Sequence, residues 1–364
     1  MEYLVPFILA TLGIIFNKKM PPAKQKTLMV IILVYIIILL GMRYRVGFDT
    51  IGYMKTYTKA RSLDKFWTVK IFLERHEPGY LFICAICKSF TKEFWPVQVI
   101  MATITNGCIF IFLYRYCRNV FVGIMFYLIL QWLYFSVEVM RESAAISIFL
   151  LNYRNFENKK WLKFYLISFL SISLHYSAII IWFLPLVKII KPNLSLIIIC
   201  ILFLTITPLI EKLGDIISIP SVTRRIEQYT STNYNLNWRI AHLIRYALPA
   251  IAVFAAFRIS KLKTDFQQMI LLHILLSIGT FSIPIIFSRI SNYTTMFVTV
   301  AIANFICLRQ VKEWIRVGLI CFTLATQSFY YYQMYHGWLP YVSIFNPKQI
   351  TERERIWRSL FSGK

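Results

Sequence analysis

The stretch LMVIILVYIIILLGMRYRVGFDT, residues 28–50, decides the fold class. Its first part, residues 28–41, carries no charged side chain, and Arg43 and Arg45 follow it closely. A bilayer-spanning helix needs about 20 apolar residues, and somewhat fewer when basic side chains at its ends extend to the lipid head groups. The stretch therefore predicts a transmembrane helix that ends at a polar, arginine-bearing segment.

The rest of the chain repeats this pattern of apolar runs separated by charge clusters. Hydrophobic residues make up 58% of the 364 residues, whereas a soluble globular protein has roughly half. The apolar runs lie near residues 2–16, 28–41, 79–91, 96–113, 120–137, 142–153, 161–174, 176–190, 194–210, 242–257, 268–287, 293–308 and 314–333. They predict an all-α, polytopic integral membrane protein with about 12 transmembrane helices, in a range of about 10 to 13. We expect a single transmembrane domain, residues 1–345, and a basic C-terminal tail, residues 346–364.

The net charge of +24 comes from 40 basic and 16 acidic residues. In a soluble protein such a charge would indicate a nucleic-acid partner. Here the basic residues collect in short loops between apolar runs, as the positive-inside bias requires, and no nucleic-acid motif is present, so no nucleic-acid partner is predicted. The seven cysteines lie in or beside apolar runs. We expect no disulfide framework, and we expect Cys84 and Cys87 to pack in the core.

Four basic clusters set the orientation of the chain in the membrane. They should lie on the cytoplasmic side, and they comprise Lys18, Lys19, Lys24 and Lys26; Arg154, Lys159, Lys160 and Lys163; Arg258, Lys261 and Lys263; and Arg309, Lys312 and Arg316. Alternating spans satisfy all four only if one of the runs 79–91 and 96–113 does not cross the bilayer. We expect 79–91 to be re-entrant or interfacial, because it is short and begins at Pro78-Gly79.

With this topology, the polar segments 42–77 and 211–241 become loops on the outer side. Arg141, His175 and Arg289 fall at the outer ends of three different apolar runs. Such convergence from distant parts of the chain predicts a functional site on the outer face. Alternation also places the tail outside, whereas its basic residues favour the inside, and its apolar residues share one helical face, which suits an interfacial helix.

The polar segment after residue 42 has a structural and a functional interpretation. In the structural one, Asp49 caps a helix that carries Tyr53, Gly47 forms a turn, and the two arginines anchor the chain at the interface. In the functional one, Arg43 and Arg45 form a fork for an anionic head group, because guanidinium groups donate paired hydrogen bonds to phosphate.

Glu77 and Arg141 also allow two interpretations. Glu77 precedes Pro78 and would either cap the short segment or act as a base. Arg141 would form an interfacial ion pair with Glu138, three residues earlier, which contributes little. Alternatively, as an ionisable residue at the end of a span, Arg141 would serve function.

His175 lies between two apolar runs joined so tightly that it must sit at the outer boundary. A lone histidine is usually a structural hydrogen-bonding residue, but this one is well placed to act as a base near neutral pH. Arg289, Asn292 and Tyr293 share one helical face at the outer end of a later run. The long outer loop adds Arg224, Arg225 and Arg239 beside aromatic residues, a mixture that suits sugar rings but also occurs in solvated loops.

In order along the chain, these segments resemble the EpsG-like polysaccharide polymerases within the wider Wzy group. The resemblance covers Met42 to Tyr341 and rests on Arg43-Tyr44-Arg45-Val46-Gly47-Phe48-Asp49 with Tyr53, Glu77-Pro78-Gly79-Tyr80, Arg141 leading an alanine-bearing run, His175 with Ser177, the Arg289 to Tyr293 segment, and Leu339-Pro340-Tyr341. A GT-C-like arrangement of the helices is compatible with it.

The resemblance implies a membrane glycosyltransferase that needs neither a metal nor a cofactor. Donor and acceptor would both be oligosaccharides linked to undecaprenyl diphosphate, and transfer would occur on the outer face of a bacterial inner membrane, in contact with lipid. A chain-length regulator protein is left open as a further partner. The sequence contains no nucleotide-binding motif and no metal-ligand cluster, which agrees with a donor already activated by a diphosphate.

Under this hypothesis, Arg141 and Arg289 hold the diphosphate, Arg45 assists, and Arg43 is a weaker candidate. His175 or Asp49 would take the proton from the acceptor hydroxyl. The remaining substrate contacts would come from Tyr53, Glu77, Asn292, Tyr293, Arg224, Arg225 and Arg239. The alternatives are a flippase for lipid-linked units, an O-antigen type glycan ligase, a membrane acyltransferase and a structural scaffold.

Overall fold

The computed structural model describes residues 2–67, 77–189, 236–280 and 284–346, together with Thr351, Glu352, Glu354, Arg355 and Arg358 of the tail. The regular secondary structure of these residues is helical, and their β pairing is limited to an isolated antiparallel bridge between Arg43 and Ser343. The prediction of an all-α protein is confirmed for this part of the chain. The chain forms two compact units: unit 1 comprises Met1–Ile179 and Gln333–Lys364, and unit 2 comprises Ile180–Tyr332.

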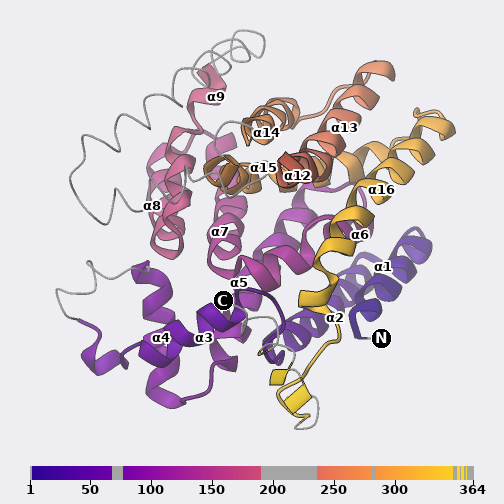
Figure 1. Ribbon diagram of the computed structural model, residues 1–364. Helices are drawn as coiled ribbons and strands as arrows, with labels where there is room; N and C mark the ends of the chain where they lie inside the picture. The colour runs from indigo at the N-terminus through magenta and orange to yellow at the C-terminus, as the bar shows by residue number, and fades with distance from the viewer. Residues whose placement is uncertain are drawn as a thin grey trace. The chain divides into compact units, whose positions relative to one another are not determined.

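A helix occupies every predicted apolar run that falls within the described residues (Figure 1). The helices of unit 1 are η1 (Glu2–Leu4), α1 (Val5–Phe16), α2 (Pro22–Gly41), α3 (Thr50–Lys59), η2 (Leu63–Lys65), α4 (Pro78–Phe90), α5 (Trp95–Tyr116), α6 (Val120–Leu130), η4 (Tyr134–Glu138), α7 (Met140–Glu157) and α8 (Trp161–Leu174). Those of unit 2 are α9 (Leu186–Ile189), α12 (Leu236–His242), η6 (Leu243–Ala247), α13 (Leu248–Ile259), α14 (Gln267–Gly279) and α15 (Pro284–Ile306). Two helices, η5 (Tyr176–Phe183) and α16 (Glu313–Trp338), cross the boundary between the units. The predicted run 194–210 lies outside the described residues.

Within the described residues, four helical segments are long and apolar enough to cross a membrane: Pro22–Gly41, Trp95–Tyr116, Asn237–Ile259 and Pro284–Ile306. The 20 residues of the first correspond to about 30 Å, which matches the hydrocarbon core of a bilayer. Several other apolar helices are shorter, so the number of about 12 spans stays a prediction. Helix α4 has 13 residues, or about 20 Å, which is too short for an upright span. Its re-entrant or interfacial placement also stays a prediction.

The surface and interior of unit 1 have the character of a membrane protein. Large apolar side chains such as Val34 and Ile38 on α2 and Leu166 on α8 are exposed on the surface. The interior, in contrast, contains hydrogen-bonded polar groups, for example the Tyr127 hydroxyl, which donates to Asn106 Oδ1 at 2.8 Å. Interhelical hydrogen bonds of this kind hold helices together where the surroundings are already apolar.

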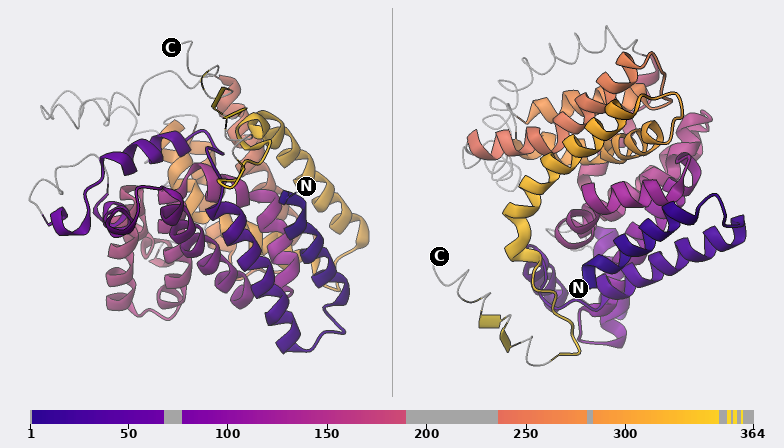
Figure 2. Two further views of the ribbon diagram at one scale, coloured as in Figure 1. Left: turned by 90° about the horizontal axis from the view of Figure 1, so that it is seen from below. Right: turned by 90° about the vertical axis from the view of Figure 1, so that its right-hand side faces the viewer.

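Helix α7 is central to unit 1, because it packs against both α5 and α8. Helix α5 in turn packs against α2, and α1 and α2 form the helical hairpin at the indigo end of the chain in Figure 2. Two glycines permit close approaches between helices. Gly41 of α2 lies against Val99 of α5, and Gly79 of α4 lies against Ser173 of α8. The second approach sets the position of the site described below.

The chain changes direction between α6 and α7 through a π-helical turn, η4. Its last residue, Glu138, is followed by Val139 in a non-helical conformation (φ −103°, ψ 46°), and α7 begins at Met140. Single π-helical turns occur mostly as local insertions between α-helices and are frequent at functional sites. This turn therefore breaks the helical register between Glu138 and the first residues of α7.

Glu138 joins two distant segments of unit 1. Its carboxylate accepts hydrogen bonds from the Trp338 indole at 2.7 Å and from the Phe48 amide at 2.9 Å. The chain can turn here because Gly47 adopts φ +101°, which side chains rarely allow, and its amide donates to the Gly337 carbonyl at 2.9 Å. The predicted turn at Gly47 is confirmed.

Candidate active site

Three predicted residues of unit 1 form one buried ionic cluster, composed of Glu77, Arg141 and His175. One oxygen of the Glu77 carboxylate accepts a hydrogen bond from Arg141 Nη1, and the other lies 2.7 Å from His175 Nδ1. The Glu77 side chain is 6% exposed, whereas the Arg141 side chain keeps 21% of its surface exposed. The cluster therefore combines a buried carboxylate with an arginine whose side chain stays partly exposed.

Three helices bring these residues together. Glu77 directly precedes α4, Arg141 is the second residue of α7, and His175 ends α8 in an extended conformation. A Cβ atom on Gly79 would lie only 2.7 Å from the Ser173 carbonyl oxygen, so α4 can approach α8 this closely only with glycine at that position. This contact, two residues from Glu77 and two from His175, holds the carboxylate beside the imidazole.

Two tyrosine rings enclose the Arg141 guanidinium. Its Cζ lies 5.6 Å from the ring centre of Tyr53 on α3 and 5.4 Å from that of Tyr80 on α4. The faces of aromatic rings attract cations at these distances. The Tyr53 hydroxyl also donates to the Glu138 carbonyl oxygen at 3.0 Å, which fixes α3 against the turn before α7. Arg141 is thus held in position by Glu77 and by rings on two sides.

The ionisation of Glu77 follows from its partners. Burial raises the pKa of this carboxyl, but the hydrogen bond from His175 and the positive charge of Arg141 outweigh that effect and lower the pKa to about 2. Glu77 is therefore a carboxylate at neutral pH and can only accept hydrogen bonds. His175 Nδ1 consequently carries the hydrogen, and in the neutral ring Nε2 is the nitrogen with the lone pair.

A second carboxylate faces the other side of the imidazole ring. Glu142 Oε2, on α7, lies 3.7 Å from His175 Nε2, and the Glu142 side chain is 2% exposed. When Nε2 accepts a proton, the charge on the ring lies between the carboxylates of Glu77 and Glu142. A carboxylate that orients a histidine and stabilises its charged form is the arrangement that makes histidine an efficient general base.

Two structural interpretations of these residues are wrong. Glu77 occupies the N-cap position of α4, but its side chain makes no capping hydrogen bond. Arg141 pairs with Glu77 and not with Glu138, because the π-helical turn and Val139 interrupt the helical spacing that would bring residues 138 and 141 together. Glu138 instead binds the indole and amide groups described above.

The arginines after α2 differ in their surroundings. Arg43 is 1% exposed, and its guanidinium donates to the Leu40 carbonyl oxygen and lies 2.7 Å from Met140 Sδ. This environment is structural. Arg45 is more accessible and pairs with Glu354 of the tail at 2.9 Å. Asp49 is exposed at the start of α3 and makes no capping hydrogen bond with its side chain.

The remaining predicted site residues belong to unit 2 or lie outside the described chain. Asn292 and Tyr293 are buried on α15, 1% and 3% exposed, and Arg289 on the same helix is half-buried. Arg239 is half-buried on α12. Arg224 and Arg225 lie outside the described residues. The roles assigned to these residues stay predictions.

Two charged residues in buried polar surroundings, Glu142 and Arg245, were not selected from the sequence. Glu142 faces His175. Because it directly follows Arg141 in the sequence, it could have been expected in the same first turn of the helix. In unit 2, Arg245 lies on a second π-helical turn, η6, with its Cζ 3.4 Å from the ring centre of Tyr330. No pattern in the sequence predicts a π-helical turn, so Arg245 could not be selected. Within the described residues, no group of His, Cys, Asp and Glu side chains is arranged to hold a metal ion.

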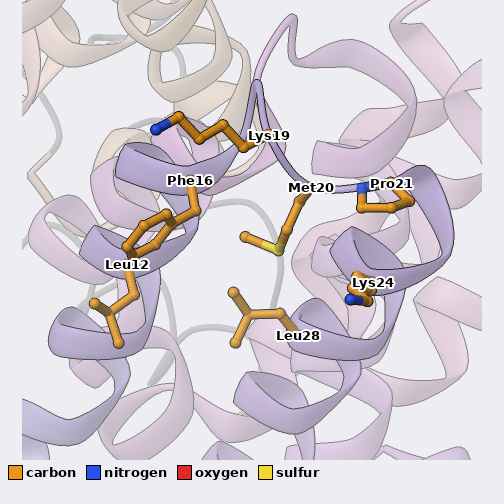
Figure 3. Close-up of a pocket in the computed structure, with 7 residues that line it drawn as sticks. All are labelled: Leu12, Phe16, Lys19, Met20, Pro21, Lys24 and Leu28. Atoms are coloured by element: carbon orange, nitrogen blue, oxygen red, sulfur yellow. The ribbon is translucent and has the colours of Figure 1, made fainter.

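A cavity of about 340 Å³ opens between α1 and α2, far along the chain from the ionic cluster (Figure 3). It is lined by apolar side chains, including Phe16 and Leu28, and by Lys19 and Lys24. Its lining contains no carboxylate and no histidine. We therefore place the candidate chemistry at the Glu77–Arg141–His175 cluster.

Comparison with known families gives a match over most of the chain. The family model described as the EpsG family matches residues 26–343. The chain belongs to the EpsG family. This family is polysaccharide-polymerase-like, and the EpsG match contains all three residues of the Glu77–Arg141–His175 cluster. Neither the curated proteins nor the solved structures gave a match.

Membership of the EpsG family indicates a role in polysaccharide biosynthesis at a membrane. The apolar helices of the EpsG chain agree with a membrane-embedded protein. The resemblance to EpsG-like proteins expected from the sequence is therefore confirmed at the level of the family.

Proposed function

We propose that this EpsG-family protein is a Wzy-type polymerase. It transfers a glycan from undecaprenyl diphosphate to the terminal sugar of another lipid-linked repeat unit, on the outer face of the bacterial inner membrane. The observation that carries the proposal is the Glu77–Arg141–His175 cluster, in which a carboxylate holds a histidine base and a partly exposed arginine together. A family of polysaccharide-polymerase-like proteins supplies the reaction class.

In the proposed reaction, His175 Nε2 takes the proton from the acceptor hydroxyl. The hydroxyl oxygen forms a bond to the anomeric carbon of the donor, and the bond between that carbon and the diphosphate oxygen breaks. The electron pair of this bond passes to the diphosphate, which leaves with an additional negative charge. Arg141 stabilises that charge because guanidinium groups bind phosphate oxygens with paired, charge-assisted hydrogen bonds.

The structure favours His175 over Asp49 as the base. His175 touches the carboxylate that also holds Arg141, so the base and the leaving-group ligand share one anchor. Asp49 is exposed at the start of α3. The role of Arg289 as a second ligand of the diphosphate, with Asn292 and Tyr293 beside it on α15, is part of the same proposal and is tested separately.

Replacement of Arg141 by alanine tests the proposal in cells that depend on this protein for polymer. We expect the ladder of long glycan chains to disappear while the variant remains in the membrane at the normal level. Arg115→Ala is the matched control, because Arg115 is an exposed arginine in the last turn of α5. A normal ladder in Arg141→Ala would refute the assignment, and the same test on Arg289→Ala decides the second ligand.

Liposomes that contain the purified protein and lipid-linked repeat units separate the proposed reaction from its alternatives. Lengthening of the glycan supports the polymerase. Movement of lipid-linked units across the bilayer without lengthening would identify a flippase, and transfer only to a different lipid acceptor would identify a ligase.

A further inference from the structure

A second cavity in unit 1 lies between the end of α2 and the start of α5. Its volume is about 230 Å³, and Arg43, Arg45, Glu93, Trp95 and Gln98 are among its lining residues. None of the residues of the Glu77–Arg141–His175 cluster lines it. Close to it, Gly41 of α2 packs against Val99 of α5, the residue that follows the lining residue Gln98.

One wall of this cavity holds a buried amide that lacks a partner. Gln98 is 3% exposed, and within the described residues its Nε2 group has no hydrogen-bond partner. Leaving a buried donor unsatisfied costs about 1–3 kcal/mol. Gln98 lines the cavity although its Nε2 atom is itself buried, so a ligand that accepts hydrogen bonds would satisfy this amide after the side chain rotates toward it.

A carboxylate of the protein's own tail already binds the charged side of the cavity. Glu354 lies 2.9 Å from Arg45 Nη2, and it accepts a hydrogen bond of 3.4 Å from the Tyr44 hydroxyl. Arg45 adopts φ +54°, a conformation that is uncommon for a side chain of this size and that is found at ligand-binding positions. The Arg45 guanidinium thus already binds an anionic group, the carboxylate of Glu354.

The charges at the cavity favour exchange of this carboxylate for another anion. Arg43 and Arg45 contribute two positive charges, and Glu93 contributes one negative charge. With Glu354 bound, the net charge of these groups is zero, whereas without Glu354 it is +1. Trp95 and Phe345 line the cavity and are 37% and 74% exposed. Exposed aromatic residues beside arginine at the end of a spanning helix are typical of the membrane interface.

We propose that this cavity binds the phosphate head group of an anionic lipid, and that Glu354 of the tail competes for the same site. The Gln98 amide and Arg45 hold the phosphate oxygens, and the exposed aromatic residues contact the lipid. None of Glu77, Arg141 and His175 lines this cavity, so Arg45, which the sequence predicted to assist with the diphosphate of the reaction, belongs in this proposal to a separate site. Its occupancy does not require glycan transfer. The tail is thereby an internal competitor that a lipid displaces.

Binding by the full-length protein in neutral detergent tests this proposal directly. The probes are farnesyl diphosphate, inorganic pyrophosphate and farnesol, measured by titration without any glycan acceptor. Each variant is also titrated in the Arg141→Ala background, which removes the diphosphate ligand of the proposed reaction centre. Arg45→Gln should weaken farnesyl diphosphate binding by about tenfold or more, because it removes a charge-assisted hydrogen bond. Glu354→Gln should strengthen binding by about two- to fivefold, the range expected for loss of a partly exposed ion pair.

Two matched variants and a third substitution make the outcome decisive. Arg115→Gln, at the other end of α5, and Glu352→Gln, an exposed carboxylate on the same tail, should leave binding unchanged. If Arg45→Gln fails to fold, Gln98→Leu should still lower affinity severalfold in a folded protein.

The three probes distinguish the sources of the phosphate group. Binding of farnesyl diphosphate with weak binding of pyrophosphate and farnesol supports a lipid head group. Equal binding of pyrophosphate would overturn the lipid assignment, and equal affinity in wild type, Arg45→Gln and Glu354→Gln would overturn the site. Because no transfer is measured, His175 variants should bind normally even if the polymerase proposal fails.

Discussion

Replacement of Glu77 by glutamine removes the charge that holds the cluster together while keeping the size of the side chain. The lowering of the Glu77 pKa from 4.5 to about 2 corresponds to about 3 kcal/mol of stabilisation at neutral pH. The Glu77 side chain is 6% exposed, so solvent screening reduces this value little. We therefore expect Glu77→Gln to be less stable than the wild type by about 3 kcal/mol at pH 7.

The stability difference between the wild type and Glu77→Gln should decrease as the pH falls. A carboxyl with a lowered pKa stabilises the folded state above its ordinary pKa, 4.5, and the stabilisation is lost as the pH falls through the folded value of about 2. By this relation, the contribution of Glu77 falls to roughly half by pH 3. Thermal unfolding of both proteins in detergent should therefore give a large difference in Tm at pH 7 that shrinks between pH 4.5 and pH 3.

Activity should fall more sharply than stability. A glutamine amide can donate to His175 Nδ1, which would place the ring hydrogen on Nε2 and remove the lone pair that accepts the proton. Loss of a general base lowers the rate by about 10²- to 10⁴-fold. A Tm difference that stays constant from pH 7 to pH 3, or full polymerisation activity in Glu77→Gln, would refute the reasoning.

Two further substitutions test how the site is supported. Gly79→Ala should lower both Tm and polymer formation, because the new Cβ would lie 2.7 Å from the Ser173 carbonyl oxygen. Gly107→Ala, with open space around it, should keep activity and gain up to about 1 kcal/mol in stability. Equal behaviour of the two variants in thermal unfolding would contradict the close approach of α4 to α8. Trp338→Phe should destabilise the protein by about 1–3 kcal/mol, because it removes the indole hydrogen bond to the buried Glu138 carboxylate, and an unchanged Tm would count against that role.

The helices were largely predictable because their signal is local. Apolar runs bounded by basic residues placed a helix at each described position, and no other secondary structure competes in an apolar segment of that length. The number of membrane crossings was less accessible, because helices such as α4 and α8 are shorter than a bilayer is thick. Their placement depends on packing partners that a sequence pattern does not contain.

The sequence identified the three residues of the Glu77–Arg141–His175 cluster as candidates, but it did not predict that they contact one another. Arg141 and His175 were selected because an ionisable residue at the end of an apolar run is a candidate for function, and because both were predicted on the outer side. Their common partner, Glu77, is 64 and 98 residues away along the chain. Its contact with them depends on the close packing at Gly79. The structural alternative for Arg141, an ion pair with Glu138, is not formed because the π-helical turn interrupts the helical spacing that the pair requires.

Arg43 shows a different limit of sequence reasoning. It lies in the same motif as Arg45, two residues away, and both were expected to bind an anionic head group. In the structure the Arg43 guanidinium turns back to the Leu40 carbonyl at the end of α2, whereas Arg45 faces the tail. Composition alone gives no means of separating an arginine that completes a helix end from one that is open to a ligand.

Transfer between lipid-linked units by the purified protein in liposomes tests the central claim most directly. The rate of glycan lengthening is measured for the wild type, for His175→Ala and for the control Arg115→Ala. The wild type and the control should lengthen the glycan equally, and His175→Ala should be slower by about 10²-fold or more. Lengthening by His175→Ala at the wild-type rate would contradict the claim that the Glu77–Arg141–His175 cluster carries out the reaction.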